Sequence, residues 1–359
     1  MPDVGPPELE LAARAMTLKY GFLGLPQGGA KAGVLGDPTR PLPERRERLR
    51  AFAHAASEML REARYVPDAD MGTEATDIRW MIEALDQPVG PHDWRNNRSG
   101  LHTATSCIAT VRAALAHRGR SLAGCRVAIE GFGHVGATLA GLLQDEGASV
   151  VAVSTAAGAI YNCDGLDVRG LRQSLLEGTA VNIPGAEMLP REALLELPVD
   201  LLCPCARGGS IHEGNAARIT APFVCAGANN PLTPGAEHML WARGVVVPPD
   251  FISNSGGVLG GTLEYAGVSP ARTSRLIARA IEPAVRRLLE DADAAAVAPR
   301  ALAEPRALAR HVRVRDAAER PTLRGHLVHI GLDWYRRGWL PGALVGAIAP
   351  AYLGRRLHA

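Results

Sequence analysis

The chain has 359 residues, with 39 basic and 37 acidic side chains and a formal net charge of +2. This balance gives no bulk attraction to nucleic acid or to an anionic membrane, and the length is sufficient for about two domains. The first residues lack a signal peptide's basic and apolar regions, and the apolar stretch 339–353 is broken by Pro341 and Pro350. Six cysteines without metal-ligand spacing indicate reduced thiols, so we expect a cytoplasmic protein.

The first part of the chain, from residue 8 to about 105, has mixed character. Apolar residues recur with helical spacing over 8–18 and over 43–64, and a shorter helix is predicted through 78–82. A glycine-rich loop lies between the first two helices. The run 91–100 is polar and rich in turn-forming residues, which predicts a domain junction there.

From Thr103 to about Gly261 the pattern alternates between strands and helices. Continuous apolar runs separated by helices are typical of a parallel sheet covered on both faces, the doubly wound α/β arrangement. The predicted strands are 126–130, 149–154, 201–204, 223–225 and 245–247, and the predicted helices include 135–146, 166–176 and 234–243. Ser99, Thr103 and Thr105 are expected just before the first helix of this region, with Thr103 lining the cofactor cleft.

The last part, from Val268 onward, is rich in Ala, Leu and Arg and predicts helices. The segment 291–305, which contains alanines and prolines, is expected to be a loose connection. Its histidines, among them His311, are expected to be solvated.

A dinucleotide-binding turn is predicted at residues 131–136, which read Gly-Phe-Gly-His-Val-Gly. A buried strand precedes the turn and a helix follows it, as this motif requires. Gly131 permits the tight turn, Gly133 lets the backbone approach a pyrophosphate, and Gly136 allows close strand–helix packing. The helix N-terminus, where His134 and Val135 lie, supplies N–H groups to the anion.

The end of the second strand bears on the choice of cofactor. Many NAD sites carry an acidic residue about 20 residues after the turn, where it bonds the ribose 2′-hydroxyl. Here Ser154 and Thr155 stand at that place. Their hydroxyls neither repel a 2′-phosphate nor hold a free diol strongly, so the expected cofactor is NAD or NADP.

Two lysines and an aspartate are the candidate catalytic residues. Lys31 lies among glycines that let the backbone bring its ammonium group close to a small substrate. Partial burial and a neighbouring positive charge from Lys19 would lower its pKa into the range useful for general base catalysis. Lys19 would also bind a substrate carboxylate as a point charge, and Asp70 would exchange protons with an amino nitrogen.

These motifs together resemble the glutamate/leucine/phenylalanine/valine dehydrogenase family over roughly residues 10 to 265. The segment 16–31 is similar to the family's carboxylate-binding lysine followed by its glycine-embedded catalytic lysine, and 67–72 is similar to its catalytic aspartate loop. The resemblance implies NAD(P)-dependent oxidative deamination of an amino acid to a 2-oxo acid and ammonia, in a homo-oligomer that binds neither nucleic acid nor membrane. It assigns Lys31 and Asp70 to catalysis. The substrate-binding residues that it implies are Lys19, Gly28, Gly29 and Asn254. The cofactor-binding residues are Thr103, Gly131, Gly133, His134, Val135, Gly136, Ser154, Thr155, Ala206 and Asn229.

Two departures from the family pattern shape the expectations. The family's usual N-terminal stretch, with a Gly-Gly-containing substrate strand, has no counterpart before Lys19, so we expect a truncated substrate domain. Glutamate-specific members carry a hydroxyl residue where this chain has Gly261. A side-chain pocket formed by Leu259 and its neighbours therefore favours a small or apolar amino acid.

The expected architecture is α/β, with a Rossmann-type domain at 103–265 and a smaller, partly truncated α/β substrate domain at 1–102. The helical segment 266–359 completes the substrate domain. Two functions remain open, an NAD(P)-dependent amino-acid dehydrogenase and a truncated, non-catalytic relative that acts as a nucleotide-binding subunit. No metal is expected.

Overall fold

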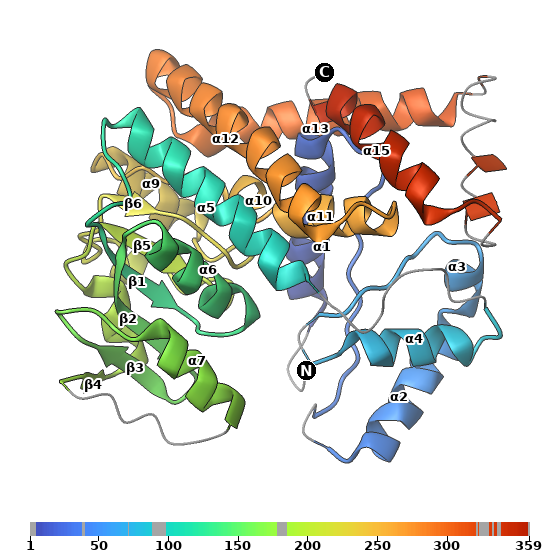
Figure 1. Ribbon diagram of the computed structural model, residues 1–359, viewed down its shortest axis with the longest axis horizontal. Helices are drawn as coiled ribbons and strands as arrows, with labels where there is room; N and C mark the ends of the chain where they lie inside the picture. Colours follow the sequence, from blue (N-terminus) through green and yellow to red (C-terminus); the bar gives the residue numbers. More distant parts are fainter. Residues whose placement is uncertain are drawn as a thin grey trace.

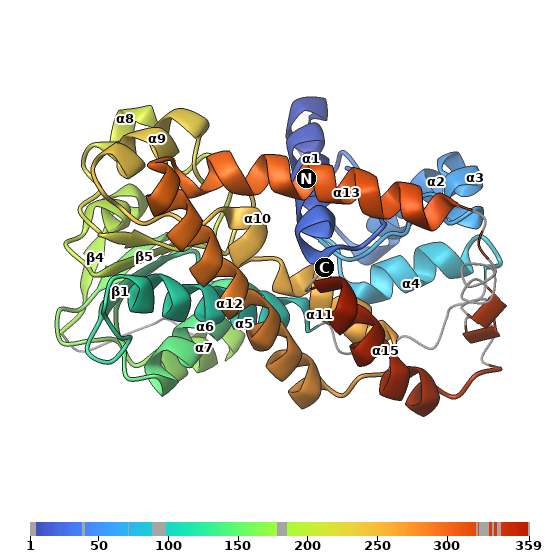
Figure 2. The same ribbon diagram turned by 90° about the horizontal axis from the view of Figure 1, so that it is seen from above.

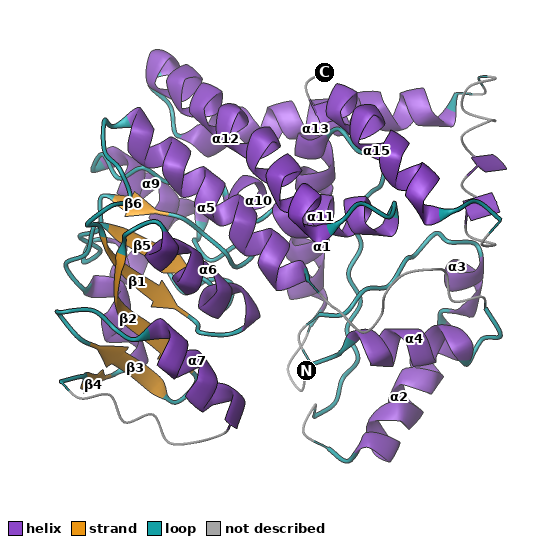
Figure 3. Cartoon of the chain, in the orientation of Figure 1, coloured by secondary structure: helices purple, strands orange, loops and turns teal. Residues whose placement is uncertain are grey.

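Strands and helices are distributed unequally in the computed structural model of the protein (Figure 1). The structure describes residues 5–37, 40–70, 72–87, 98–177, 185–320, 322, 330–331, 334–335 and 339–357. Within these ranges all strands lie at one end of the molecule, and the N-terminal elements α2 to α4 lie at the other end as helices joined by loops (Figure 3). The expected α/β fold is confirmed. The predicted junction at 91–100 falls mostly outside the described residues.

A single six-stranded sheet in the order β4-β3-β2-β1-β5-β6 forms the nucleotide-binding half. Strands β2, β1, β5 and β6 are parallel, and β3 and β4 extend the edge in antiparallel pairing. The strands are β1 Arg126–Glu130, β2 Ser149–Thr155, β3 Gly158–Tyr161, β4 Glu187–Leu189, β5 Leu201–Pro204 and β6 Phe223–Val224.

The sheet differs from the sequence prediction at both edges. The predicted strand 245–247 is wrong, because only Val246 forms a single bridge to Phe223. Pro248 and Pro249 follow at once, and proline has no N–H group with which to continue the ladder. The strands β3 and β4 were not predicted, since segments this short show no clear alternation.

The helices match the predicted positions with two further corrections. They are α1 Pro6–Leu23, α2 Leu42–Ala55, α3 Ser57–Arg61, α4 Ala75–Glu83, α5 Ser99–His117, α6 His134–Asp145, α7 Val168–Glu177, α8 Glu213–Ala216, α9 Pro234–Ala242, α10 Asp250–Ser253, α11 Gly256–Tyr265, α12 Pro270–Ala295, α13 Pro299–Glu319 and α15 Gly342–Leu357, with a 3₁₀ helix at Arg191–Glu196. The predicted helix 43–64 is in fact α2 and α3, interrupted at Ala56. The predicted loose connection 291–305 is mostly helical, because Pro299 occupies the first turn of α13, where proline is well tolerated.

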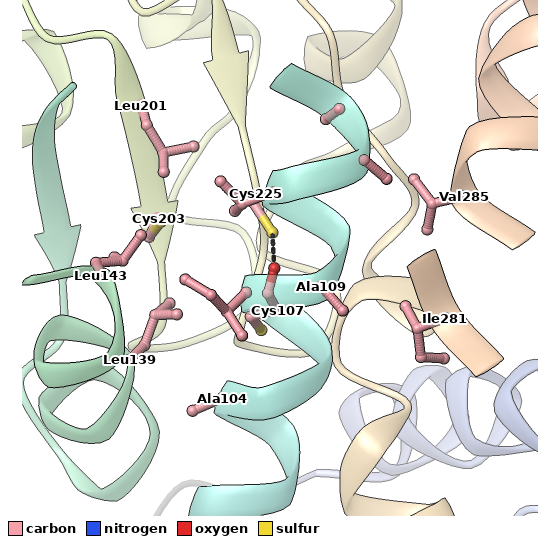
Figure 4. Packing of buried hydrophobic residues seen from close by; sticks show 14 of the residues in the cluster. Ala104, Cys107, Ala109, Leu139, Leu143, Leu201, Cys203, Cys225, Ile281 and Val285 are labelled. Carbon is pink, nitrogen blue, oxygen red and sulfur yellow. Dashed lines mark hydrogen bonds between the residues drawn. The ribbon is translucent and has the colours of Figure 1, made fainter. Parts of the chain in front are cut away.

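Helix α5 runs through the middle of the core. Its side chains are buried on nearly every face, so the sequence shows no amphipathic pattern there. It packs between α6, which contributes Leu139 and Leu143, and α12, which contributes Ile281 and Val285 (Figure 4). The residues expected before this helix, including Thr103, therefore lie within it.

Helix α13 passes across α1 at the centre of the molecule (Figure 2). At the crossing, a Cβ atom on Gly21 would lie 2.1 Å from the carbonyl oxygen of Ala307, so the two backbones are in direct contact. His311 is buried in this contact, contrary to the expected solvated position, and burial lowers the pKa of its imidazole. The C-terminal helices thus hold α1 against the nucleotide-binding half.

Candidate active site

Three predicted residues from distant parts of the sequence meet at one point. The Lys19 Nζ atom on α1 donates a hydrogen bond to Asn229 Oδ1 at 2.7 Å, and the Asn254 Nδ2 atom donates to the same oxygen at 3.1 Å. All three side chains come from different segments, so the contact joins α1 to the loops after β6 and α10. The Asn254 Oδ1 atom is buried without a hydrogen-bond partner among the described residues. The site therefore offers an ammonium group and a free amide oxygen, which suit a carboxylate and an N–H donor respectively.

Lys19 is 7% exposed, and this burial dominates the chemistry of its ammonium group. Burial lowers the pKa of Lys19 to about 8, with Lys31 acting in the same direction and the Asp250 carboxylate and Cys107 thiol opposing it. Below that pH, Lys19 is a buried cation in need of an anionic partner.

Lys31 and Asp70 form an ion pair between the glycine-rich loop and the loop after α3. Burial lowers the pKa of Lys31 from its ordinary value, and the negative charge of Asp68 opposes this shift. The Lys31 side chain is 22% exposed and that of Asp70 is 53% exposed. The pair is thus accessible to a small molecule while Lys31 is already partly desolvated.

The glycine-rich loop is held in place by its contact with α1. The Gly29 amide donates to Thr17 Oγ1 at 3.1 Å, and a Cβ atom at Gly29 would lie 2.1 Å from the carbonyl oxygen of Ala13. Only glycine fits this approach, which brings Lys31 into the electrostatic range of Lys19. A Cβ atom at Gly28 would meet nothing within 4 Å, so that position faces open space.

The predicted dinucleotide turn has the geometry that a pyrophosphate requires. Gly131 has a φ angle of 90°. A Cβ atom at Gly136 would lie 1.9 Å from the carbonyl oxygen of Gly131. A Cβ atom at Gly133, by contrast, would meet nothing within 4 Å, and Gly133 directly precedes helix α6. Open space beside the N-terminus of a helix suits a bound phosphate, so the turn fits a dinucleotide.

The turn lies at the position where the strand order reverses. Strand β1 has β2 on one side and β5 on the other, which is the switch point where open α/β sheets bind ligands. A Cβ atom at Gly131 would lie 2.8 Å from the Ala206 backbone, which places the loops after β1 and β5 side by side. The Val135 side chain reaches Gly227, two residues before Asn229, with Cγ1 3.1 Å from a Cβ atom built there. The turn and the Lys19 site are therefore adjacent.

Other predicted cofactor residues occupy supporting positions. The Ser154 hydroxyl accepts a hydrogen bond from the Gly131 N–H at 3.1 Å, and Ser154 is almost fully buried. Ser154 therefore stabilises the conformation of the turn. The Thr155 hydroxyl accepts the Ala157 N–H at 3.2 Å. His134 is exposed at the start of α6. Thr103 lies against the start of α11, where a Cβ atom on Gly257 would be 2.8 Å from its hydroxyl.

The structure corrects the predicted side-chain pocket. Leu259 is fully buried in the hydrophobic core and forms no part of an open pocket. A Cβ atom at Gly261 would meet nothing within 4 Å, so open space lies at that position instead. Helix α11 turns Leu259 inward because residues two apart on a helix point in different directions.

Two features of the site were not recognised from the sequence. The first is that the two predicted lysines, Lys19 and Lys31, are the only lysines in the sequence, since the other basic residues among the 39 are arginines. Of these two side chains, arginine keeps its proton at all relevant pH values, whereas a buried lysine can lose its proton near neutral pH. Both lysines lie at this site, so a simple count of lysines would have identified it. The second feature is Asp250, a buried carboxylate near Lys19.

The described residues contain no group of His, Cys, Asp and Glu arranged to bind a metal ion. In the same ranges, no helix has both the length and the apolar character needed to cross a membrane.

Comparisons with known proteins identify the family of the chain. The family model "Glutamate/Leucine/Phenylalanine/Valine dehydrogenase" matches residues 97–317, and "Glu/Leu/Phe/Val dehydrogenase, dimerisation domain" matches residues 1–87. The chain is 39% identical over 272 residues to a glutamate dehydrogenase of Thermotoga maritima, covering 72% of this chain and 65% of that protein. It is 35% identical over 275 residues to NADP-specific glutamate dehydrogenase A1 of Halobacterium salinarum, with the same coverage of 72% and 65%.

Solved structures share the fold. The hetero-hexameric glutamate dehydrogenase of Thermus thermophilus, in its Leu-bound form, has a TM-score of 0.75 at 26% identity, covering 89% of this chain and 81% of that one. The L-tryptophan dehydrogenase of Nostoc punctiforme has a TM-score of 0.61 at 22% identity, covering 88% and 86%.

The fold and the site define a protein of the dinucleotide-binding α/β class. The chain belongs to the glutamate/leucine/phenylalanine/valine dehydrogenase family, as its sequence resemblance predicted. Its match covers 65% of the length of the curated relatives named above.

Proposed function

We propose that the protein is an NAD(P)-dependent dehydrogenase that oxidatively deaminates an L-amino acid to a 2-oxo acid and ammonia. The observation that carries this proposal is the placement of the chain's two lysines. One is buried against Asn229 beside the dinucleotide turn, and the other pairs with Asp70. A chain that otherwise uses arginine as its cation retains lysine where a compact charge and a removable proton are needed.

In the proposed mechanism, Lys19 binds the substrate α-carboxylate. The buried ammonium group gains a partner for its charge, and the binding energy fixes the α-carbon relative to the turn at 131–136. Asn229 orients the ammonium group by accepting its hydrogen bond, and Asn254 fixes the Asn229 amide by donating to the same oxygen. The carboxylate binds best while Lys19 is protonated, which means below a pH of about 8.

A bound nicotinamide supplies the acceptor for the hydride that leaves the α-carbon. Lys31, in its neutral form, removes a proton from water so that the water oxygen attacks the iminium carbon of the substrate. Asp70 takes a proton from the substrate ammonium group before the hydride leaves and returns it to the carbinolamine nitrogen. The carbinol hydroxyl group then loses its proton to solvent, so that the C=O bond of the 2-oxo acid forms as the C–N bond breaks and ammonia leaves. The lowered pKa of Lys31 supports this assignment, because a general base must be able to lose its proton near the working pH.

We propose an apolar side chain for the substrate. Gly261 leaves open space and supplies no hydroxyl group. Lys19 is assigned to the α-carboxylate and Lys31 to the water molecule, so neither lysine of the chain is left to bind a carboxylate on the substrate side chain. Relatives of this fold named as glutamate dehydrogenase and as tryptophan dehydrogenase indicate that the scaffold accommodates more than one side-chain class. Initial rates with leucine, valine, phenylalanine and glutamate test this point. A clear preference for glutamate would refute it.

NAD and NADP are both compatible with the proposal. Relatives include an NADP-specific enzyme and an NAD-specific enzyme of Staphylococcus aureus, and Thr155 at the end of β2 carries no charge that would exclude a 2′-phosphate.

A homo-oligomer is also part of the proposal. The match to a dimerisation-domain model over residues 1–87 supports it, as does a structural relative described as hetero-hexameric. Apolar side chains exposed in that N-terminal region would be covered by a partner; they are Leu11, Leu35, Leu42, Met59 and Val66. Light scattering on the purified protein tests this, and a monomer at micromolar concentration would contradict it.

A spectrophotometric assay with purified protein tests the activity itself. Formation of reduced nicotinamide with an amino acid and NAD or NADP is the expected result. Folded protein that binds the dinucleotide but gives no turnover with any amino acid would instead favour a non-catalytic nucleotide-binding subunit.

A further inference from the structure

A buried ionic cluster, formed by Arg300, Asp250 and Glu237, lies next to the Lys19 site. None of these three residues was predicted as a site residue. Arg300, in the first turn of α13, donates from Nη2 to Asp250 Oδ1 and from Nε to Glu237 Oε2 at 2.6 Å. The Asp250 side chain is 1% exposed and that of Glu237 is 6% exposed. The guanidinium group also lies over the Phe251 ring, 5.7 Å from its centre. Segments from α9, α10 and α13 are thus joined through a single arginine.

The cluster is connected to Lys19 by an unbroken set of contacts. The second oxygen of Asp250 accepts the backbone N–H of Asn230 at 2.8 Å, and the neighbouring Asn229 side chain accepts from Lys19 at 2.7 Å. Asp250 is also the first residue of α10, and Asn254 lies directly after that helix. The Asp250 carboxylate therefore fixes the loop that carries Asn229, the asparagine that accepts from the ammonium group, and Asp250 begins the helix that ends at Asn254.

Helix α13 also contacts α1, the helix that carries Lys19. Arg310 donates to the carbonyl oxygen of Phe22 on α1 at 2.6 Å, and Gly21 of α1 lies directly against Ala307. The helix therefore fixes the position of α1, which carries Lys19, and through Arg300 it fixes the loop that carries Asn229. Figure 2 shows α13 passing from the nucleotide-binding half to α1.

Stability alone gives a poor reason for such a cluster. Burying charged groups costs hydration energy, and well-packed apolar residues of similar size often stabilise a fold as much or more. What apolar side chains cannot provide is directional control of an amide N–H and a nearby ammonium group. Asp250 does both, because it accepts from Asn230 and is the principal negative charge acting on Lys19.

We infer that Arg300, acting through Asp250 and the loop at Asn229 and Asn230, is a positioning residue for the carboxylate-binding lysine Lys19. This inference rests on the proposed function, since it assigns the cluster to substrate binding. Arg300 hydrogen-bonds to the Asp250 and Glu237 carboxylates and lies over the Phe251 ring. Its effect on Lys19 is therefore transmitted through Asp250. Its loss should weaken binding of the amino acid more than it slows the chemical step.

The kinetic test compares Arg300→Met with Arg306→Met. Arg306 is on the same helix but exposed, and its ion pair is with Asp291, so it is the matched control. Arg300→Met should raise KM for the amino acid about tenfold or more while kcat changes by less than about threefold. Arg306→Met should leave both unchanged, and the dissociation constant of the dinucleotide should be unaffected in both variants. If Arg300→Met fails to fold, Arg300→Lys replaces it. This variant keeps the charge but cannot reach both carboxylates in the same way, so a smaller rise in KM is expected.

A second readout observes Lys19 directly. Because the chain has two lysines, protein labelled with ¹³C-lysine gives two side-chain Cε signals, which Lys31→Arg assigns. Asp250→Asn should shift the Lys19 titration to lower pH, because it removes the principal negative charge beside the ammonium group. The titratable groups acting on Lys19 are Asp250 on α10, Lys31 in the glycine-rich loop and the Cys107 thiol on α5, and Asp250 is the carboxylate among them.

A structural role without positioning gives a different result. In that case Arg300→Met lowers the melting temperature while KM stays at the wild-type value, and Asp250→Asn leaves the Lys19 titration unchanged; either finding overturns the inference. If the wild-type protein shows no turnover, the proposed function fails. The Lys19 titration then still decides whether the cluster controls this lysine.

Discussion

Three glycines of the dinucleotide turn and its helix provide a test that needs no knowledge of the substrate. Gly133, Gly136 and Gly141 differ in what a methyl group would meet. At Gly136 a Cβ atom would lie 1.9 Å from the Gly131 carbonyl oxygen, whereas at Gly133 and Gly141 it would meet nothing within 4 Å. The same substitution to alanine should therefore have three different effects.

The magnitudes follow from these contacts. Gly136→Ala requires a shift of about 1 Å in a packed turn, which costs about 1–3 kcal/mol or more in the free energy of unfolding. Gly133→Ala costs at most about 1 kcal/mol, as expected for the residue that precedes a helix. It should nevertheless raise the dissociation constant of NAD or NADP at least about tenfold, equivalent to about 1.4 kcal/mol. Gly141→Ala lies within α6 and should stabilise the protein by about 0.5–1 kcal/mol with unchanged affinity.

Urea unfolding and dinucleotide titration by fluorescence measure the two quantities separately. Normal dinucleotide affinity in a folded Gly133→Ala protein would refute the assignment of the turn. Wild-type stability in Gly136→Ala would refute the packing argument.

The remaining predictions concern the two lysines and the pocket. Lys31→Arg should reduce kcat about a thousandfold, like Lys31→Ala, because arginine keeps its proton and cannot act as a base; near-normal turnover of Lys31→Arg would contradict this role. The KM for the amino acid should rise above pH 8 as Lys19 loses its proton, and a KM independent of pH through this range would count against carboxylate binding by Lys19. Lys19 also makes stability depend on pH. Its pKa is about 8 in the folded state and near 10.5 when exposed, so the unfolded state binds more protons between these values and the free energy of unfolding should rise with pH there. Lys19→Met should reduce this rise, as measured by urea unfolding at several pH values, and the part that remains is expected from Lys31, whose pKa is also lowered. Gly261→Ser should increase the ratio of kcat/KM for glutamate over leucine, and an unchanged ratio would show that this position does not face the substrate side chain.

The sequence predicted the parts of the structure that depend on strong local patterns. The four parallel strands are continuous apolar runs, and the turn at Gly131 carries its own signature of glycines between a strand and a helix. The family resemblance predicted Lys19 and Asn254 as substrate-binding residues and Asn229 as a cofactor-binding residue. Their side chains lie together in the structure, and their roles stay predictions. The proposed domain boundaries at 102 and 265 stay predictions.

Other features depend on contacts that no local pattern encodes. Helix α5 is buried on nearly every face, so its amphipathic signal is absent, and its start was placed too late. Leu259 was assigned to a pocket because of its neighbours in sequence, although the helix turns it into the core. Arg300 lies far along the chain from Asp250 and resembles many other arginines in sequence. Only the folded chain identifies it as the partner of a buried carboxylate.

The most direct test of the account is the absorbance of reduced nicotinamide in wild-type protein and in Lys31→Ala, each with an amino acid and NAD or NADP at alkaline pH. The account predicts a steady rise in absorbance for the wild type and a loss of about a thousandfold or more in the variant, with dinucleotide affinity retained. Equal rates in the two proteins would contradict the assignment of Lys31 as the catalytic base. Folded wild-type protein that binds the dinucleotide yet produces no reduced nicotinamide would contradict the proposed activity.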